Sequence, residues 1–256
     1  MHYICQMSGG VGSFFAARRT LERHGPENVT LLFADVKMED EDLYRFLDDC
    51  ERWLAHPVTR IAEGRDPWQV FADVKYLGNT RIDPCSRVLK RDFLRSWAEE
   101  HHPDASNATI VIGIDWTEEH RLKQAAGRYE PYGVWAPLCE PPYIDKAQML
   151  QELADIGIAE PRLYGMGFPH NNCGGFCIKA GQAQFKMLLE KMPDRYAYHE
   201  QKEQEMRELL GKDVAILRDR RGGDTKPLTL AELRRRVEAE TDETDPHDLG
   251  GCGCAL

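Results

Sequence analysis

The 256-residue sequence contains no apolar run of the roughly 20 residues that a membrane-spanning helix needs. Residues 1–10 also lack a basic segment followed by an apolar one, so we expect a cytoplasmic protein without a secretory signal and without a membrane partner. Positive charge is in deficit, with 33 basic against 43 acidic residues and a formal net charge of -10. This balance argues against unspecific binding to nucleic acid and leaves small anionic ligands as candidates.

Several catalytic motifs are missing as well. The sequence has neither a His-Glu-x-x-His pattern nor a Gly-x-Ser-x-Gly turn, which argues against zinc-protease and α/β-hydrolase chemistry. It has eight cysteines but no secretory context, so we expect metal binding or redox chemistry rather than a disulfide framework. Three of them lack partners nearby in the sequence and are interpreted as small buried hydrophobes: Cys5, Cys50 and Cys139.

Short apolar runs alternate with longer helical patterns over the first 130 residues. The runs predict buried strands at 2–7, 29–35, 58–63 and 108–115. The intervening patterns predict helices at 13–24, about 40–55, 66–77 and 86–101. Such alternation predicts an α/β fold, with a parallel twisted sheet covered by helices on both faces.

The pattern becomes mostly helical after about residue 140. We predict helices at about 145–156, 179–191 and 195–210, a strand at 213–219, and a last helix that begins with a capping box at Thr229. We therefore divide the chain into an α/β domain, 1–140, and a mostly helical C-terminal region, 141–256. Residues 241–256 are acidic and then glycine-rich, a composition typical of a disordered tail, although the tail also carries two cysteines.

A glycine cluster, Ser8-Gly9-Gly10-Val11-Gly12-Ser13, follows the first predicted strand and leads into the first predicted helix. A loop of this kind exposes backbone N–H groups at a helix N-terminus, where an anion is favoured. Glycines also serve plain turns, so the pattern alone leaves phosphate binding and a bare turn open. The glycine order fits neither the Walker loop nor the Rossmann fingerprint.

Four later segments extend this pattern in order: LLFADVKMEDEDLYRFL (31–47), PCSRVLKRDFL (84–94), IGIDWTEEHRL (112–122) and EPRLYGMGFPHNNCGGFC (160–177). Together with SGGVGS they resemble the PP-loop ATP pyrophosphatase superfamily, also called adenine nucleotide alpha hydrolases, and within it the phosphoadenosine phosphosulfate (PAPS) reductase-like proteins. This resemblance implies a HUP-type fold and a PP-loop nucleotide-binding domain over 1–140.

The same resemblance implies roles for individual residues. It assigns ATP with Mg²⁺ to Ser8, Gly9, Gly10, Gly12, Ser13 and Asp35. It also implies that three basic residues face phosphate or substrate during catalysis: Arg87, Lys90 and Arg121. The sequence departs from the family pattern at Asp115, where arginine is usual, and at Glu119, where serine is common.

Two close pairs of cysteines are candidates for a metal centre. Two glycines separate Cys173 from Cys177 and permit the bend that brings both sulfurs to one ion, and Cys252 and Cys254 form a second pair in the tail. Four thiolates suffice for zinc or for a [4Fe-4S] cluster, and both stay open. A distant resemblance to adenosine phosphosulfate (APS) reductases implies a cluster held by Cys85, Cys173, Cys177 and a tail cysteine. We assign Cys252 to that place and Cys254 as a nucleophile or sulfur carrier.

These observations predict an enzyme that cleaves ATP to AMP and pyrophosphate, adenylates a substrate and prepares it for sulfur transfer. The alternatives are an APS/PAPS reductase that uses a C-terminal cysteine and a zinc-stabilised nucleotide-binding subunit without catalysis. Expected partners are a nucleotide substrate and either a nucleic acid or a sulfur-donor protein, and a homodimer is also compatible with the sequence. Arginines in 218–221 and 234–236 form either a local basic patch or a salt-bridged surface.

Overall fold

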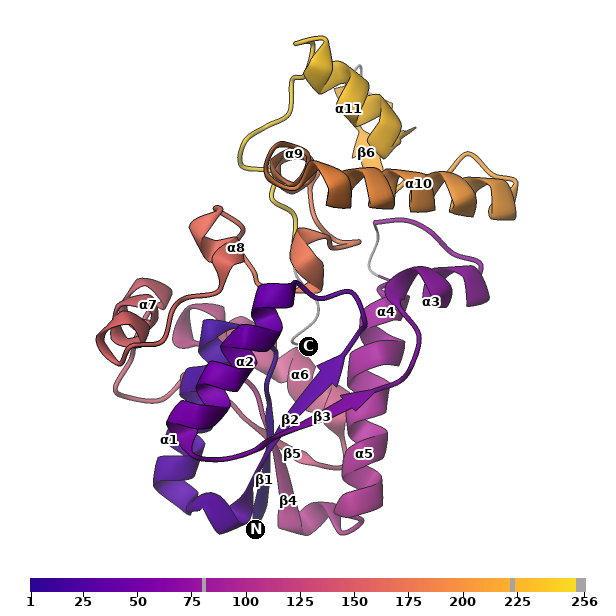
Figure 1. Ribbon diagram of the computed structural model, residues 1–256. Helices are drawn as coiled ribbons and strands as arrows, with labels where there is room; N and C mark the ends of the chain where they lie inside the picture. The colour runs from indigo at the N-terminus through magenta and orange to yellow at the C-terminus, as the bar shows by residue number, and fades with distance from the viewer. Residues whose placement is uncertain (80–81, 222–223, 252–256) are drawn as a thin grey trace.

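The computed structural model describes residues 1–79, 82–221 and 224–251 (Figure 1). Its main sheet has five strands in the order β3-β2-β1-β4-β5, and all neighbouring pairs are parallel. The strands are β1 (His2–Gln6), β2 (Val29–Asp35), β3 (Val58–Ala62), β4 (Ala108–Val111) and β5 (Gly133–Trp135). The predicted α/β fold with a parallel sheet is therefore confirmed, and β5 is an additional edge strand.

Helices cover both faces of this sheet, as predicted. One face packs against α1 (Val11–His24), α2 (Glu41–Leu54) and α7 (Lys146–Asp155), and the other against α5 (Phe93–His101) and α6 (Leu122–Tyr129). The alternation of side chains along β2 shows why: Leu31 and Phe33 lie in the core of the first face, whereas Leu32 and Ala34 lie in that of the second. Each face of the strand is apolar, so both must be covered.

The strand order creates a crevice at the carboxyl ends of β1 and β4. The chain leaves β1 through α1 to β2 on one side, and it returns through α5 to β4 on the other side. The loops after β1 and β4 therefore run in opposite directions, and ligands of open parallel sheets bind at such points.

The segment between β3 and β4 differs from its prediction. Helix α3 (Pro67–Asp73) ends early, and the single helix expected over 86–101 is divided into α4 (Pro84–Ser86), a π-helical stretch η2 (Arg87–Asp92) and α5. The extra residue in each π turn rotates the following side chains relative to an α-helix.

The C-terminal region lies above the carboxyl ends of the strands in Figure 1. It contains α8 (Arg162–Gly165), α9 (Gln182–Lys191), α10 (Pro193–Leu210), β6 (Leu217–Asp219), β7 (Lys226–Leu228) and α11 (Leu230–Glu238), and the chain also forms short 3₁₀ turns at Pro26–Asn28, Ala105–Asn107, Trp116–Arg121 and Cys173–Gly175. The predicted cap of α11 is present, since the Thr229 side chain accepts a hydrogen bond from the N–H of Glu232 at 3.1 Å. The strand predicted at 213–219 is reduced to β6, which pairs with β7.

Two apolar contacts cross residue 140. Trp68 and Phe71 of α3 lie in the core of the C-terminal helices, whereas Met149 and Leu153 of α7 lie in a core shared with α1 and the sheet. The division of the chain at 140 therefore remains a prediction. Among the described residues, no helix combines the length and apolar character that crossing a bilayer requires.

The tail is ordered as far as Gly251, unlike the disordered tail that its composition suggests. Gly250 forms an antiparallel bridge with Ala180, the N–H of Gly181 donates to Leu249 O at 3.0 Å, and the N–H of Gly251 donates to Lys179 O at 3.0 Å. Backbone pairing, which composition does not report, fixes this segment. Cys252 and Cys254 lie outside the described residues.

Candidate functional site

The glycine loop connects β1 to α1 in the crevice between β1 and β4. Gly9 has a φ of +77°, and its carbonyl accepts a hydrogen bond from Asn171 Nδ2 at 2.8 Å. A Cβ atom on Gly12 would lie 2.6 Å from the backbone oxygen of Gly113, so only glycine permits the loop to pass this close to the end of β4. Gly10 caps α1 without a side-chain hydrogen bond. The N-cap residue thus makes no side-chain hydrogen bond to α1, and the N–H of Val11 donates to the Tyr164 hydroxyl at 3.4 Å.

A cavity of about 260 Å³ lies in front of this N-terminus. The glycine loop contributes Ser8, Gly10, Gly12 and Ser13 to its lining. Arg121 of the 3₁₀ turn, Lys146 of α7, Tyr164 of α8 and Asn171, which follows α8, also line it. Ser13 Oγ donates to Gly10 O at 2.7 Å and so stabilises the loop itself. Asn171 is 1% exposed, and its Oδ1 has no hydrogen-bond partner in the described part of the chain. A buried acceptor of this kind favours a donor group on a bound molecule.

Two cations approach the cavity. Arg121 is paired with Glu118, as the 3₁₀ turn that carries both residues allows. Lys146 Nζ donates to Pro169 O at 2.8 Å and lies 3.8 Å from the centre of the Tyr164 ring. Burial lowers the Lys146 pKa, against nearby carboxylates that raise it. Sequence reasoning missed Lys146 because it opens an ordinary helical pattern far from the loop in sequence.

Asp115 stands where the resemblance described above would place an arginine, and it has a local role in the structure. Its side chain accepts hydrogen bonds from the N–H and the hydroxyl of Thr117, at 2.8 and 2.5 Å, and so caps the turn that carries Arg121. Asp115 and Glu118 also line the cavity. These two residues therefore add carboxylate groups to the lining of the site.

Lys90 lies behind the loop, beside a smaller cavity of about 50 Å³ that shares Ser8 and Gly113 with the first one. Its Nζ forms an ion pair with Glu39 Oε1 at 3.1 Å, and the two side chains are 8% and 0% exposed. The other carboxylate oxygen of Glu39 accepts a hydrogen bond from the N–H of Cys173. A buried ion pair thus connects the end of β2, the π-helical stretch and the cysteine turn.

Arg87 is not brought to the loop. Its side chain is 58% exposed and lies 3.9 Å from Asp92, whereas Arg91 is buried and makes two 3.0 Å hydrogen bonds to Asp83. The π-helical stretch accounts for this exchange, because it changes which side chains face inward.

Asp35 is the last residue of β2, and its side chain stabilises the loop that follows this strand. Its Oδ1 accepts from the N–H of Lys37 at 2.7 Å and from the Tyr44 hydroxyl at 3.0 Å, and burial together with this carboxylate raises the Tyr44 pKa. In the described chain Asp35 lines neither of the two cavities at the loop.

The cysteine turn has the expected bend. Cys173, Gly174 and Gly175 have φ values of +51°, +59° and +84°, a run that glycine makes possible. Cys173 packs with Cys85 in a small apolar cluster, and Cys177 Sγ lies 4.0 Å from Gly251 O in the tail. In residues 1–79, 82–221 and 224–251, no three metal-ligating side chains are grouped to hold an ion. The three described candidate ligands therefore do not form a metal site by themselves.

Of the remaining cysteines, Cys5 and Cys50 are buried, as interpreted from the sequence, whereas Cys139 is only partly buried. Cys5 and Cys50 are 2% and 0% exposed. Burial raises the pKa of Cys5 to about 12 and that of Cys139 to about 11. Burial also raises the pKa of Cys50, so all three thiols stay protonated at neutral pH.

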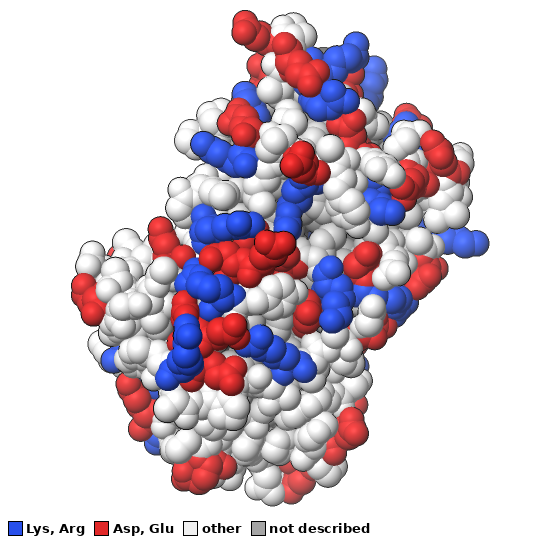
Figure 2. Space-filling model, viewed as in Figure 1, with Lys and Arg blue, Asp and Glu red and all other residues white. Residues whose placement is uncertain are grey.

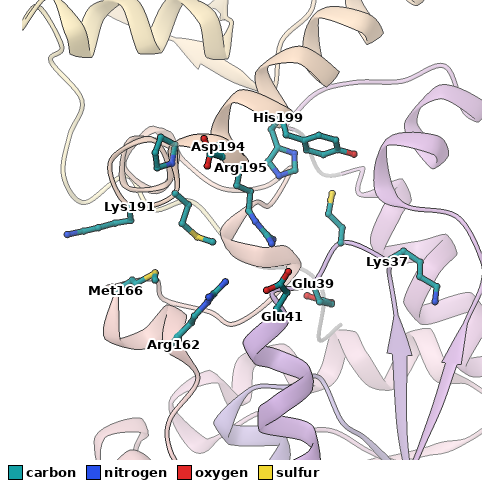
Figure 3. Close-up of a pocket in the computed structure, with 13 residues that line it drawn as sticks. Lys37, Glu39, Glu41, Arg162, Met166, Lys191, Asp194, Arg195 and His199 are labelled. Atoms are coloured by element: carbon teal, nitrogen blue, oxygen red, sulfur yellow. The ribbon is translucent and has the colours of Figure 1, made fainter.

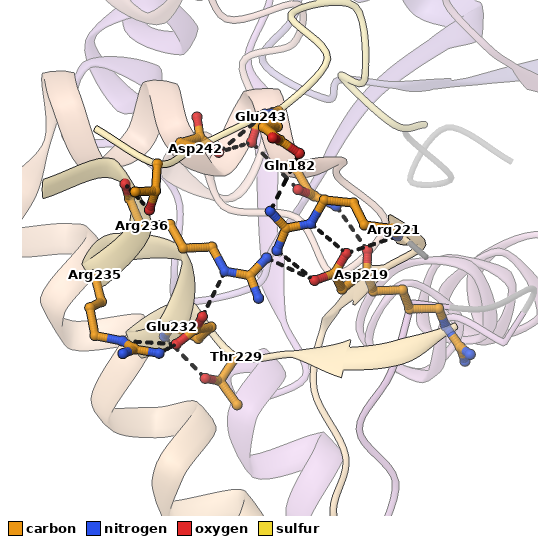
Figure 4. Close-up of polar contacts among 12 residues, drawn as sticks. Gln182, Asp219, Arg221, Thr229, Glu232, Arg235, Arg236, Asp242 and Glu243 are labelled. Atoms are coloured by element: carbon orange, nitrogen blue, oxygen red, sulfur yellow. Dashed lines mark hydrogen bonds and ion pairs between the residues drawn. The ribbon is translucent and has the colours of Figure 1, made fainter. Parts of the chain in front are cut away.

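The arginines near the C-terminus are neutralised by carboxylates (Figure 4). Asp219 pairs with Arg221 and Arg236, and Glu232 pairs with Arg235 and Arg236. Figure 2 likewise shows acidic and basic side chains intermixed across the middle of one face. This geometry favours the salt-bridged surface over a basic patch.

No family model matches the sequence, and no curated protein matches it. Among solved structures, the chain is similar to the NH3-dependent NAD synthetase from Campylobacter jejuni in complex with the nitrate ion. The identity is 12%, the match covers 82% of this chain and 84% of that one, and the TM-score is 0.37.

Proposed function

We propose that the chain is a PP-loop enzyme that binds ATP with Mg²⁺ at the Ser8–Ser13 loop and transfers AMP to an oxygen atom of its substrate. The observation that carries the proposal is the N-terminus of α1, which begins at a glycine cap and faces a cavity that Lys146 and Arg121 also line. Backbone donors, a helix dipole and two cations together favour a polyphosphate. The smaller apolar cavity beside Ser8 would have to widen to take the base.

In this reaction the substrate oxygen attacks the α-phosphorus, and the bond from that phosphorus to the bridging oxygen breaks. Pyrophosphate leaves with the electron pair, and the loop N–H groups, Lys146 and Arg121 stabilise its charge. Asp115 and Glu118 line the cavity with carboxylate oxygens, the ligands that Mg²⁺ prefers, and Mg²⁺ would supply further charge neutralisation. Lys90, held by Glu39, fixes the rear wall of the loop.

The finer part of the proposal is sulfur transfer with a cysteine-ligated [4Fe-4S] cluster, or zinc in its place. Its support is the return of the tail to Cys177. Gly251, whose carbonyl oxygen contacts the Cys177 sulfur, directly precedes Cys252 in the sequence. Cys85, Cys173, Cys177 and Cys252 would be the ligands, and Cys254 the sulfur carrier. Because the described cysteines do not group as a site, no step of the reaction is assigned to a cluster. A nucleic acid or a sulfur-donor protein as partner, and a homodimer, remain proposals.

Incubation of the purified protein with labelled ATP tests the main proposal. We expect AMP and pyrophosphate, and we expect Ser8→Ala to abolish their formation while metal content stays unchanged. Cys173→Ala should keep AMP and pyrophosphate formation but lose the metal, measured as iron and sulfide, or as zinc, after anaerobic purification. Sulfite release from APS or PAPS without ATP cleavage would instead identify the sulfonucleotide reductase, which the docked tail also favours. Binding of ATP without either reaction would identify a nucleotide-binding subunit.

A further inference from the structure

A larger cavity, of about 750 Å³, lies outside the glycine-loop site, between α2, α8 and the start of α10 (Figure 3). Its walls carry charged side chains from each of these elements: Lys37, Glu39, Glu41, Arg162, Lys191, Asp194 and Arg195. The volume falls within the range of small-molecule sites. Of these residues only Glu39 has a part in the proposed adenylation, through its ion pair with Lys90.

His199 supplies a buried donor in the wall of this cavity. Its ring is 0% exposed, and its Nδ1 accepts a hydrogen bond from Trp68 Nε1 at 3.1 Å. Because an indole N–H can only donate, the neutral ring carries its proton on Nε2. Within the described chain Nε2 has no partner. An unpaired buried N–H is costly, so an acceptor on a ligand would be favoured there.

Arg195 extends into the cavity from the first turn of α10, and Arg162 extends toward it from α8 (Figure 3). Arg162 is paired with Asp40, whereas no described carboxylate forms an ion pair with Arg195. A Cβ atom on Gly174 would lie 1.2 Å from Arg195 Nη1, so this glycine leaves the space that the guanidinium occupies. The N-terminus of α10 has no side-chain cap and lies at the same cavity. Lys191 adds a second cation at this end and Asp194 of the first turn of α10 adds one carboxylate, so the charge there is positive on balance.

We infer that this cavity is a second ligand site, which binds a small polar molecule through an oxyanion, phosphate or carboxylate, held by Arg195 and the Nε2–H of His199. Charge-assisted hydrogen bonds from an arginine make such a contact strong. Glu41, which Figure 3 shows below the end of the Arg195 side chain, accepts hydrogen bonds from hydroxyl groups of the same molecule and disfavours a second negative charge. The ion pair of Glu39 and Lys90 separates this site from the glycine loop, so its occupancy does not require ATP.

Glycerol 3-phosphate is the probe for a phosphate site and glycerate is the probe for a carboxylate site. Glycerol has similar hydroxyl groups but no charge, so it serves as the control. Titration calorimetry should show binding of at least one charged probe and no binding of glycerol. Arg195→Gln should raise the dissociation constant of that probe at least about tenfold, through loss of a charged hydrogen bond. Ser8→Ala and Lys212→Ala, an exposed lysine beyond the far end of α10, should leave it unchanged.

Binding that survives Arg195→Gln, or that is lost in Ser8→Ala, would overturn the inference, as would no binding of either probe at millimolar concentrations. A second measurement needs no Arg195 variant. The Nε2–H resonance of His199, identified by its loss in His199→Phe, should shift when the bound probe is added to the ¹⁵N-labelled wild-type protein. An unchanged resonance at saturation would also contradict the assignment. ATP turnover, measured in parallel, reports on the glycine loop separately.

Discussion

Lys90 is a buried cation that forms an ion pair with the buried carboxylate of Glu39, and this makes the pair sensitive to the loss of either member. Lys90→Met would leave the buried charge of Glu39 uncompensated, so the free energy of unfolding should fall by about 3 to 5 kcal/mol in urea denaturation. The double variant Lys90→Met/Glu39→Gln removes both charges and should recover most of this loss. Lys123→Met, at an exposed position of α6, is the control and should unfold like the wild type. Equal stability of Lys90→Met and wild type would contradict the pairing.

Gly12 and Gly127 both lie in helices, and their surroundings predict opposite effects of alanine. Gly12→Ala forces a Cβ against Gly113 O and should lower stability by about 1 to 3 kcal/mol, with weaker ATP binding. Gly127→Ala meets no atom within 4 Å and should raise stability by about 0.5 to 1 kcal/mol. Thermal unfolding of the two variants measures this difference. A Gly12→Ala protein as stable as Gly127→Ala would show that the loop does not need its close approach to β4.

His199 makes stability depend on pH in a definite direction. Burial and Arg195 lower its pKa from 6.5 to about 3 in the folded chain, so between these values the unfolded state binds one more proton. The contribution of His199 to the free energy of unfolding is therefore complete above pH 6.5 and decreases as the pH falls. At pH 5 the free energy of unfolding should be lower by about 2 kcal/mol. His199→Phe should show a correspondingly flatter pH dependence in urea denaturation, and His247→Asn, at an exposed position, should keep the wild-type slope. Parallel slopes for all three proteins would rule out a buried neutral histidine.

At the scale of elements, the tail pairs through one β-bridge and several backbone hydrogen bonds with residues 179–183. Deletion of residues 248–256 removes the partners of Gly181 and Ala183, whose N–H groups donate to Leu249 O and Asp248 O at 3.0 Å. Hydrogen exchange at these two amides should accelerate, with a stability loss of about 1 kcal/mol for each bond. Deletion of residues 252–256 alone is the matched control and should leave both amides protected. Equal exchange in the two truncated proteins would show that the pairing contributes nothing.

The elements also show how far sequence patterns reach. Four of the five strands of the sheet and the glycine loop could be predicted because apolar runs and glycine spacing are local properties. The exposure of Arg87 could not be foreseen, since its assignment rests on a resemblance, and a π-helical stretch, which no local pattern indicates, brings Arg91 inward instead. Lys146 becomes a site residue only through its contact with Tyr164 of α8. Arg195 becomes one only through its contact with Gly174, which precedes α9. No single-sequence pattern reports contacts of that kind.

At the scale of the whole molecule, the two cores are built from both halves of the chain. Trp68 and Phe71 complete the core of the C-terminal helices, and α7 completes that of the sheet. We therefore expect one cooperative unfolding transition, with the same midpoint by fluorescence and by circular dichroism. The fragments 1–140 and 141–256, expressed separately, should each expose these apolar surfaces and bind a hydrophobic dye. A fragment that is soluble and unfolds cooperatively would instead support a domain boundary at 140.

The bridge between Gly250 and Ala180 has a kinetic consequence for the thiols of the last five residues. Cys252 comes directly after a residue whose carbonyl contacts Cys177, so an encounter between the tail thiols and Cys177 is intramolecular. Short tethers give effective concentrations in the millimolar range, far above those of the protein in solution. Exchange of a metal, a sulfur atom or a disulfide between these positions should therefore proceed at a rate independent of protein concentration, and thiols of other molecules would compete poorly with the tail.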